Sequence, residues 1–352
     1  MSEKNNIKNI PLVASIIAVC LGLVAIGLTL NNKSDDSSTT TTKPSTANTT
    51  ATNHSSMTAD EMDKMMKAPT DKFLELATKE GNVENTTWME PTILEDGTKQ
   101  FELTASVFDW ETAPGVTVKA WGYNKQVPGP NIKVDVGDKV KIVLKNELEE
   151  STVIHIHGLK DIPNTMDGVP DVTQAPVKPG ESFTYEFTAN TPSIAMYHSH
   201  HNAQVQVPNG LAGIFKVGDL PIPSGINVAQ EIPMMLNDAG TVGLSLNGKS
   251  FPGTKAVVAK TGDYILVHYL NEGLTTHPMH THGFDQMVIA EDGNVLETPY
   301  SQDTIQVAPG SRVSVLIKLD RAGAWAWHCH ILTHAEGPKG MFGMVTAIVV
   351  AD

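Results

Sequence analysis

One short stretch near the C-terminus combines a thiol, three imidazoles and a thioether. Cys329 lies between His328 and His330, His334 follows five residues after the cysteine, and Met341 comes seven residues later. The chain has 2 cysteines, and the other lies in an apolar run near the N-terminus. Two imidazoles and a thiolate in a trigonal plane, with a weak axial methionine, make up a blue-copper site. The stretch therefore predicts a copper centre, whereas a buried inert cysteine is the structural alternative.

Four His-x-His pairs account for most of the 13 histidines. Residues i and i+2 of a β-strand face the same side, so each pair directs two imidazoles at one point. Eight imidazoles are too many for one metal ion, but they fit a cluster of three ions. The pairs are His155/His157, His198/His200, His280/His282 and His328/His330.

The same alternation places the side chain of Cys329 on the opposite face of its strand from His328 and His330. This tripeptide would therefore connect a mononuclear metal site with a metal cluster through covalent bonds. Such a connection is a path for electrons between the two sites.

The chain contains the same β-rich unit twice. Landmarks of the first copy recur in the second at a constant offset of 125 residues: Gly137 as Gly262, Asn146 as Asn271 and His155 as His280. The second halves of the copies repeat at an offset of 130, so that Tyr197-His198-Ser199-His200 matches Trp327-His328-Cys329-His330. Period-two alternation and frequent turn residues make a Greek-key β-sandwich the natural architecture for each unit.

The residues proposed for the mononuclear site occur only in the second copy, whereas each copy keeps both of its His-x-His pairs. The two ligand sets therefore vary independently, as two separate metal sites require. The alignment also favours Met341 over Met344 as the axial ligand, because Met344 matches Ile214. The matched positions are His277 with Thr152, Cys329 with Ser199, His334 with Gln204 and Met341 with Leu211.

Composition supports a two-domain β protein. A chain of 352 residues is long enough for about two domains, each with its own core. The 28 glycines, 21 prolines and 40% hydrophobic residues are typical of a turn-rich globular chain. A net charge of −14 argues against nucleic acid as a partner, because phosphate binding needs a basic surface.

The N-terminal region predicts a membrane anchor. Residues 11–30 form an apolar run long enough to cross a bilayer, and Lys4 and Lys8 precede it. The positive charges predict that residues 1–10 are cytoplasmic and that the remainder of the chain lies outside the cytoplasm. We expect an uncleaved, single-pass anchor in the cell membrane, with a signal peptide as the alternative.

Between the anchor and the β domains, residues 31–56 are rich in Ser, Thr and Asn and predict a flexible tether. Residues 57–82 predict a helical segment with several methionines on one face. The two β domains are expected over residues 88–218 and 226–352.

The metal motifs resemble those of the multicopper oxidases, the laccase family. Because it has two β domains rather than three, the chain resembles the small two-domain laccases, and the similarity covers about residues 92–350. The resemblance implies an all-β fold of two tandem cupredoxin-like domains. The motifs that carry it are His155-Ile156-His157-Gly158, Tyr197-His198-Ser199-His200, His277-Pro278-Met279-His280-Thr281-His282-Gly283 and His328-Cys329-His330 with His334.

The resemblance implies about four copper ions per chain. In this family the axial Met usually follows the last His by five residues, where this chain has Lys339. Met341 therefore requires a small insertion, and a type 1 site without Met is the alternative. The implied ligands are His277, Cys329, His334 and Met341 for type 1, His155 and His280 for type 2, and His157, His198, His200, His282, His328 and His330 for the type 3 pair.

The implied activity is an oxidase that takes electrons singly from a small reductant at type 1 copper and reduces dioxygen to water at the cluster. His334 is the expected entry point for electrons, and Cys329 begins the path to the cluster. Asp167 resembles an acidic residue near type 2 copper and is a candidate proton relay, or else a turn aspartate. The resemblance also implies a homotrimer with each cluster between two subunits.

Two alternatives remain open. A copper nitrite reductase, or another oxidoreductase of nitrogen compounds, shares the two-domain trimeric plan. However, it needs one type 2 copper on three histidines and a type 1 site in the first domain, where this chain has Ser199. A copper-buffering envelope protein without turnover needs no electron path, so the His-Cys-His sequence argues against it.

Overall fold

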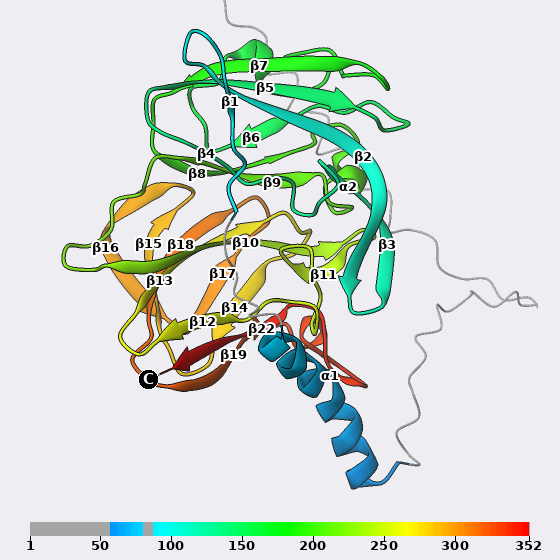
Figure 1. Ribbon diagram of the computed structural model, residues 1–352, viewed down its shortest axis with the longest axis vertical. Helices are drawn as coiled ribbons and strands as arrows, with labels where there is room; N and C mark the ends of the chain where they lie inside the picture. Colours follow the sequence, from blue (N-terminus) through cyan, green and yellow to red (C-terminus); the bar gives the residue numbers. More distant parts are fainter. Residues whose placement is uncertain (1–56, 80–86, 352) are drawn as a thin grey trace, which may run out of the picture. The chain divides into compact units, whose positions relative to one another are not determined.

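The computed structural model describes residues 57–79 and 87–351. The predicted membrane anchor at 11–30 and the tether at 31–56 lie outside these residues. Within the described part of the chain, no helix is both long and apolar enough to cross a lipid bilayer. A long helix is followed by two β domains with short helical turns, which confirms the all-β prediction (Figure 1).

The first domain consists of two sheets (Figure 1). Their orders are β1-β2-β5-β7, with β3 also paired to β2, and β4-β9-β8-β6. In β5, Val140, Ile142 and Leu144 are buried and the intervening residues are more exposed, as a strand covering a core requires. The elements are β1 (Thr92–Ile93), β2 (Lys99–Ala113), β3 (Val116–Tyr123), β4 (Ile132–Val134), β5 (Asp138–Asn146), β6 (His155–His157), η2 (Asn164–Met166), β7 (Ser182–Ala189), β8 (Ser193–His198), α2 (Ala203–Gln206) and β9 (Ala212–Val217).

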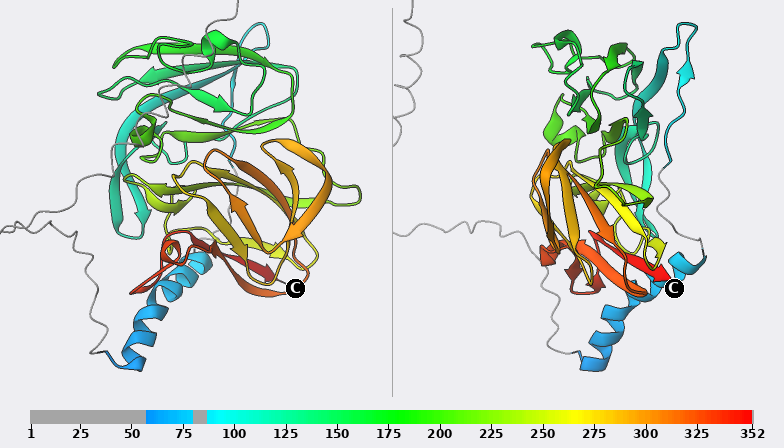
Figure 2. Two further views of the ribbon diagram at one scale, coloured as in Figure 1. Left: turned by 180° about the vertical axis from the view of Figure 1, so that it is seen from behind. Right: turned by 90° about the vertical axis from the view of Figure 1, so that its left-hand side faces the viewer.

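The second domain has two large sheets and a small hairpin (Figure 2). The orders are β11-β10-β13-β18-β15-β16, β12-β22-β19-β14-β17 and β20-β21. The elements are β10 (Val228–Ala239), β11 (Gly243–Leu246), β12 (Val257–Lys260), β13 (Tyr264–Asn271), β14 (His277–Thr281), β15 (Gln286–Glu291), β16 (Asn294–Gln302), β17 (Thr304–Val307), β18 (Arg312–Lys318), β19 (Gly323–Cys329), η3 (Leu332–His334), β20 (Glu336–Gly337), β21 (Gly340–Met341) and β22 (Val345–Ala351).

The internal repeat of the sequence is a repeat of topology. The order β4-β9-β8-β6 in the first domain has the same sequence of neighbours as β12-β22-β19-β14 in the second. The first pair of each series is parallel and the next two pairs are antiparallel. Likewise, β2 pairs in parallel with β5 as β10 pairs with β13. Both copies therefore present their metal-binding sequences from equivalent strands.

The helix α1 (Ala59–Lys79) packs on the end of the second domain that carries β21 and β22 (Figure 1). Its N-terminus is a capping box: Thr58 N donates to Glu61 Oε2 at 2.8 Å and Glu61 N donates to Thr58 Oγ1 at 3.2 Å. Phe73 anchors the other end, because it is 3% exposed and its ring lies 4.9 Å from that of Phe251.

A buried charged network joins the two domains. Lys216 on β9 forms an ion pair with Glu231 on β10, and the Lys216 side chain is only 3% exposed. His268 on β13 donates from Nε2 to Glu231 Oε1 at 2.8 Å, while its Nδ1 lies 2.8 Å from Ser314 Oγ. Burial raises the pKa of Glu231, but the hydrogen bonds and charges of His268 and Lys216 outweigh burial and lower the pKa to about 2. Burial lowers the pKa of His268.

Acid should weaken the domain interface through this network. A carboxyl with a pKa of about 2 in the native state stabilises the fold above its unfolded pKa of about 4.3, and that stability is lost as the pH falls towards 2. We expect Glu231→Gln to lower the free energy of unfolding by about 2 kcal/mol at neutral pH, as measured by urea unfolding. The free energy of unfolding of the variant should also fall less steeply than that of the wild type below a pH of about 4.3. Glu102→Gln, which alters the exposed Lys145 pair, is the control. An unchanged acid slope in Glu231→Gln would contradict this assignment.

Candidate metal centre

The structure brings together His277, Cys329 and His334. One ligand atom of each lies within 4.8 Å of the others. Cys329 Sγ is 3.6 Å from His277 Nδ1 and 3.8 Å from His334 Nδ1. A metal ion about 2.0–2.3 Å from nitrogen and sulfur ligands requires ligand atoms spaced in this way. The three residues therefore fit a trigonal copper site.

The local environment keeps these ligands neutral until a metal binds. Burial raises the pKa of the Cys329 thiol to about 11 and lowers the pKa of His277 to about 4. His277 and Cys329 are 0% exposed, whereas His334 is partly exposed. Copper binding must therefore displace the thiol proton, which is the usual coupling between metal affinity and ligand ionisation.

A carboxylate absent from the sequence analysis lies behind His277. Asp238 Oδ2 is 3.6 Å from His277 Nε2, and the Asp238 side chain is 4% exposed. The backbone N–H groups of Leu274 and Thr275 donate to its two carboxylate oxygens at 2.7 and 3.0 Å. The carboxylate makes no hydrogen bond to Nε2 at this distance, but its charge faces the Nε2 edge of the ring while Nδ1 faces the thiol. No spacing in the sequence relates residue 238 to residue 277.

The corresponding position in the first domain is a polar network. Thr152 Oγ1 donates to Gln206 Oε1 at 2.9 Å, and Ser199 Oγ donates to the same oxygen. Thr152 and Ser199 were predicted to match His277 and Cys329, and they do lie together. The third member is Gln206 rather than Gln204, which was the predicted counterpart of His334. The hydroxyls and the amide satisfy one another, so this position has no ligand set for copper.

The sequence alignment is wrong at the axial position. In the first domain Ser199 N donates to the carbonyl of Leu211 at 3.1 Å, and in the second Cys329 N donates to the carbonyl of Met344 at 3.0 Å. The strand registers agree, since His198 pairs with Ala212 and His328 pairs with Val345. The structural counterpart of Leu211 is therefore Met344, because the second copy has three more residues in this loop than the offset of 130 allowed.

The surroundings of the two methionines also distinguish Met344 from Met341. Met344 is 0% exposed and belongs to the buried cluster that contains Cys329, and its N–H donates to the carbonyl of His334 at 2.9 Å. Met341 is 39% exposed and pairs with Glu336 in the β20–β21 hairpin. The hydrogen bonds hold Met344, not Met341, against the two ligands Cys329 and His334.

The eight paired histidines form two groups of four. In the first domain the ring centroids lie 4.9–6.2 Å apart, and in the second they lie 4.9–5.7 Å apart. The groups arise from equivalent pairings, because His155 lies opposite His198 and His280 lies opposite His328. Among the ring contacts of the described residues, none joins one group to the other.

The hydrogen bonds of the histidines are also repeated. His155 and His280 donate from Nδ1 to the carbonyls of Asp167 and Asp303, at 2.6 and 3.0 Å. His198 and His328 donate from Nδ1 to the carbonyl of the following residue, at 2.8 and 3.0 Å. Each of these rings therefore keeps Nε2 for a metal, which is the second-shell arrangement expected around metal-binding histidines.

Crowding and burial favour neutral imidazoles in both groups. Burial, together with the neighbouring rings, lowers the pKa of His157 to about 3 and also lowers those of His282 and His328. The Nε2 atoms of His282 and His328 lie 3.1 Å apart. Because neutral imidazoles are the metal-binding form, the residues present fit copper ions between them.

Asp167 has a counterpart that the sequence analysis missed. Its Oδ1 lies 3.5 Å from His155 Nδ1, and Asp303 Oδ2 lies 4.0 Å from His280 Nδ1. A cavity of about 480 Å³ borders His280 and Asp303. The repeat offsets could not reveal this pair, because Asp303 follows its histidine by 23 residues and Asp167 follows by 12. The two aspartates reach equivalent positions from loops of different length.

Comparison with known proteins agrees with this geometry. The multicopper oxidase family matches residues 105–221 and 225–350. The solved structure of multicopper oxidase mgLAC is 33% identical with a TM-score of 0.67, covering 71% of this chain and 86% of that one. Blue copper oxidase from Nitrosomonas europaea is 30% identical with a TM-score of 0.67, covering 71% and 85%.

A curated relative is a probable nitrite reductase-hydroxylamine oxidoreductase fusion protein of Kuenenia stuttgartiensis, 32% identical over 277 residues, or 71% of this chain. The chain spans between 19% and 38% of the length of the first curated relatives that it matches. The solved structures, by contrast, are matched over most of their length and share the cupredoxin-like fold. The chain belongs to the multicopper oxidase family.

Proposed function

We propose that the chain is a laccase-like oxidase that couples one-electron oxidation of a small reductant to four-electron reduction of dioxygen to water. The observation that carries the proposal is the end of β19, where Cys329 joins the buried triad and His328 joins the four-histidine group of the second domain. Bound copper would supply one-electron redox chemistry at the triad and dioxygen reduction at the histidine groups.

The residues assigned to copper follow from the geometry of the buried triad and of the two four-histidine groups. We assign His277, Cys329 and His334 to type 1 copper, and Met344 rather than Met341 would be its fourth, weak ligand. About four copper ions per chain are proposed. His155 and His280 are assigned to type 2 copper, and His157, His198, His200, His282, His328 and His330 to the type 3 pair.

The side chains have separate tasks in this proposal. His334 is the only member of the triad with partial exposure, so its ring edge is where a reductant would deliver electrons. The His328 Nδ1–H bond to the Cys329 carbonyl, at 3.0 Å, shortens the path between the two sites. The backbone carbonyls of Asp167 and Asp303 hold the rings of His155 and His280. The carboxylates of the same aspartates, 3.5 and 4.0 Å from the ring Nδ1 atoms, are proposed to relay protons towards the cluster.

Each chain supplies two half-clusters, and this supports an assembly that joins them. A group of four histidines lies in each domain, and four imidazoles cannot provide the eight ligands of one trinuclear cluster. A ring of subunits would place the first-domain group of one chain against the second-domain group of its neighbour. We propose a homotrimer on this basis. An extracytoplasmic location, with residues 11–30 as anchor, is also proposed from the sequence.

Nitrite reduction is a second candidate because the Kuenenia relative is named as a probable nitrite reductase fusion. The Thr152–Ser199–Gln206 network is unfavourable for it, since a first-domain type 1 site has no ligands there. Four coppers per chain and oxygen uptake with a phenol would favour the oxidase. One or two coppers, or no oxygen uptake with any reductant by the fully loaded protein, would contradict it.

Replacing the thiol tests the proposed electron path. We expect Cys329→Ser to lose the intense blue absorption of a copper–thiolate bond and all oxygen uptake, while about three coppers per chain remain bound. Ser199→Ala at the equivalent position of the first domain is the matched control and should keep the colour. Visible absorption, oxygen electrode and metal analysis are the measurements. Blue colour in Cys329→Ser would refute the triad.

The axial assignment is tested by a pair of variants. Met344→Leu removes a thioether beside Cys329, so we expect it to raise the reduction potential of the blue copper by on the order of tens of millivolts. Met341→Leu changes a methionine in the exposed hairpin and should leave the potential unchanged. Redox titration of the blue absorption measures both. A shift in Met341→Leu alone would restore the assignment made from the sequence.

Shared clusters can be tested by complementation. The double variant His198→Ala/His200→Ala removes two of the four imidazoles of the first-domain group. The double variant His280→Ala/His282→Ala does the same in the second-domain group. Each should be inactive alone. Because some interfaces of a mixed trimer join two intact groups, co-expression should restore about a quarter of the wild-type oxygen uptake. Clusters built within one chain would give no recovery.

A further inference from the structure

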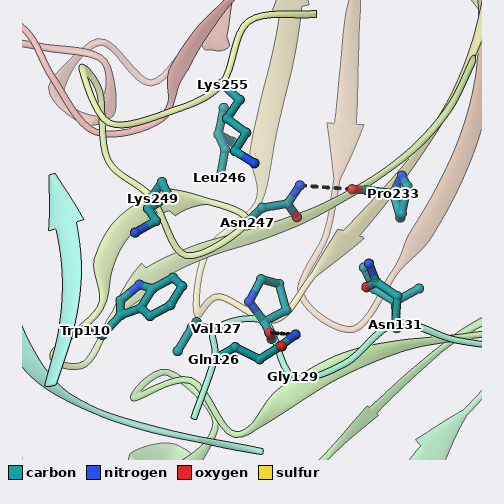
Figure 3. Close-up of a pocket in the computed structure, with 12 residues that line it drawn as sticks. Trp110, Gln126, Val127, Gly129, Asn131, Pro233, Leu246, Asn247, Lys249 and Lys255 are labelled. Atoms are coloured by element: carbon teal, nitrogen blue, oxygen red, sulfur yellow. Dashed lines mark hydrogen bonds between the residues drawn. The ribbon is translucent and has the colours of Figure 1, made fainter. Parts of the chain in front are cut away.

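A pocket between the two domains lies apart from the copper-binding residues. Its volume is about 270 Å³, and both domains contribute to its walls. Trp110, Gln126 and Asn131 come from the first domain and lie opposite Lys249 and Lys255 of the second (Figure 3). A volume near the lower end of the ~300–1,000 Å³ typical of ligand pockets suits a molecule of one ring.

Rigid contacts form the pocket. A Cβ on Gly248, where φ is +70°, would lie 2.5 Å from the carbonyl oxygen of Val127 across the domain interface. Trp110 Nε1 donates to the Gly248 carbonyl at 2.7 Å, again between domains. Asn247 donates to the Pro233 carbonyl at 3.0 Å and accepts from Met235 N at 2.7 Å. The walls are therefore preorganised, which lowers the entropic cost of binding.

The charge of the pocket is opposite to that of the chain. Lys249 Nζ lies 3.9 Å from the centre of the Trp110 ring and donates to the backbone carbonyl of Glu111. Burial lowers the pKa of Lys249 most, the nearby charge of Glu111 raises it, and the charge of Lys255 lowers it. Among the described residues, no carboxylate lies within 4.0 Å of either ammonium, and Glu111 acts on Lys249 only from a greater distance. Two lysines that line one pocket and lack such an ion pair, in a chain of net charge −14, favour an anion.

The rest of the lining is mostly apolar. Beside the amides of Gln126, Asn131 and Asn247, an apolar wall is formed by Val127, Pro128, Ile214, Pro233 and Leu246. The indole N–H is already occupied and the Lys249 ammonium lies over the ring, so Trp110 offers its remaining aromatic surface and no donor. An anionic group would meet the lysines, and a flat hydrocarbon body would meet the apolar wall.

We propose that this interdomain pocket binds a small monocyclic aromatic carboxylate, with its carboxylate between Lys249 and Lys255 and its ring against Trp110 and the apolar wall. Inorganic anions satisfy the lysines but leave the apolar wall in contact with water. Neutral aromatic molecules cover the apolar wall but leave the lysines without an anion. The site is independent of the copper ligands and of the proposed oxidase activity.

The test uses the full chain and isothermal titration calorimetry with three probes: benzoate, its neutral analogue benzamide, and inorganic phosphate. We expect benzoate to bind once per chain and at least tenfold more tightly than either of the others. Lys249→Gln and Lys255→Gln should each weaken benzoate at least tenfold. Lys139→Gln, on the outer surface of the first domain, should not. Equal binding of benzamide or phosphate, or benzoate affinity unchanged by both lysine variants, would overturn the proposal.

A second measurement does not depend on variants. The wild-type chain is irradiated with 4-azidobenzoate, with and without excess benzoate, and the labelled peptides are identified by mass spectrometry. Benzoate-protected labelling within residues 110–131 and 233–255 is the expected result. Protected labelling confined to the surroundings of His334 would assign the binding to the copper centre and refute the interdomain site.

Discussion

The alternation of side chains along β19 is the constraint on which the rest of this molecule depends. Because consecutive residues of a strand face opposite sides, Cys329 points into the buried cluster of the second domain. His328 and His330 join the imidazoles on the other face. Two chemically different sites are thereby separated by one residue of backbone. A shift of one residue in the pairing of β19 with β14 or β22 would reverse this arrangement, so the flanking strand registers matter as much as the ligands themselves.

The two domains show how one fold supports a metal site or replaces it. Equivalent strands bring Thr152 and Ser199 together in one domain and His277 and Cys329 together in the other. In the first domain two hydroxyls donate to the Gln206 amide oxygen, and the amide nitrogen donates to Glu150 and Ser151. In the second, two imidazoles and a thiol face one another at 3.6 and 3.8 Å and fit a metal ion. Burial and strand order are therefore common to both domains, whereas the side chains at these three positions differ between them.

The interface between the domains is held by polar as well as apolar contacts. Ile194 and Met196 of the first domain share a buried cluster with Met235 and Leu270 of the second. The Lys216–Glu231–His268 network lies at the same boundary and fixes β9 relative to β10. This rigidity matters for the proposed function, because each chain must present two half-clusters in fixed orientations to its neighbours.

The sequence by itself determined the repeat, the all-β class and the residues of the triad and the histidine groups, because ligand type and period-two spacing are properties of short segments. It did not determine which methionine lies beside Cys329, since Met341 and Met344 differ only in how the loop after His334 is spaced. The backbone of Met344 is held beside Cys329 and His334 by hydrogen bonds that exist only in the folded chain. Asp238, Asp303 and the partners of His268 were likewise set by loops and strands distant in sequence. Strand periodicity predicts which face of a sheet a side chain occupies. The path of a loop depends on contacts with distant parts of the chain, so only the tertiary structure shows where its side chains lie.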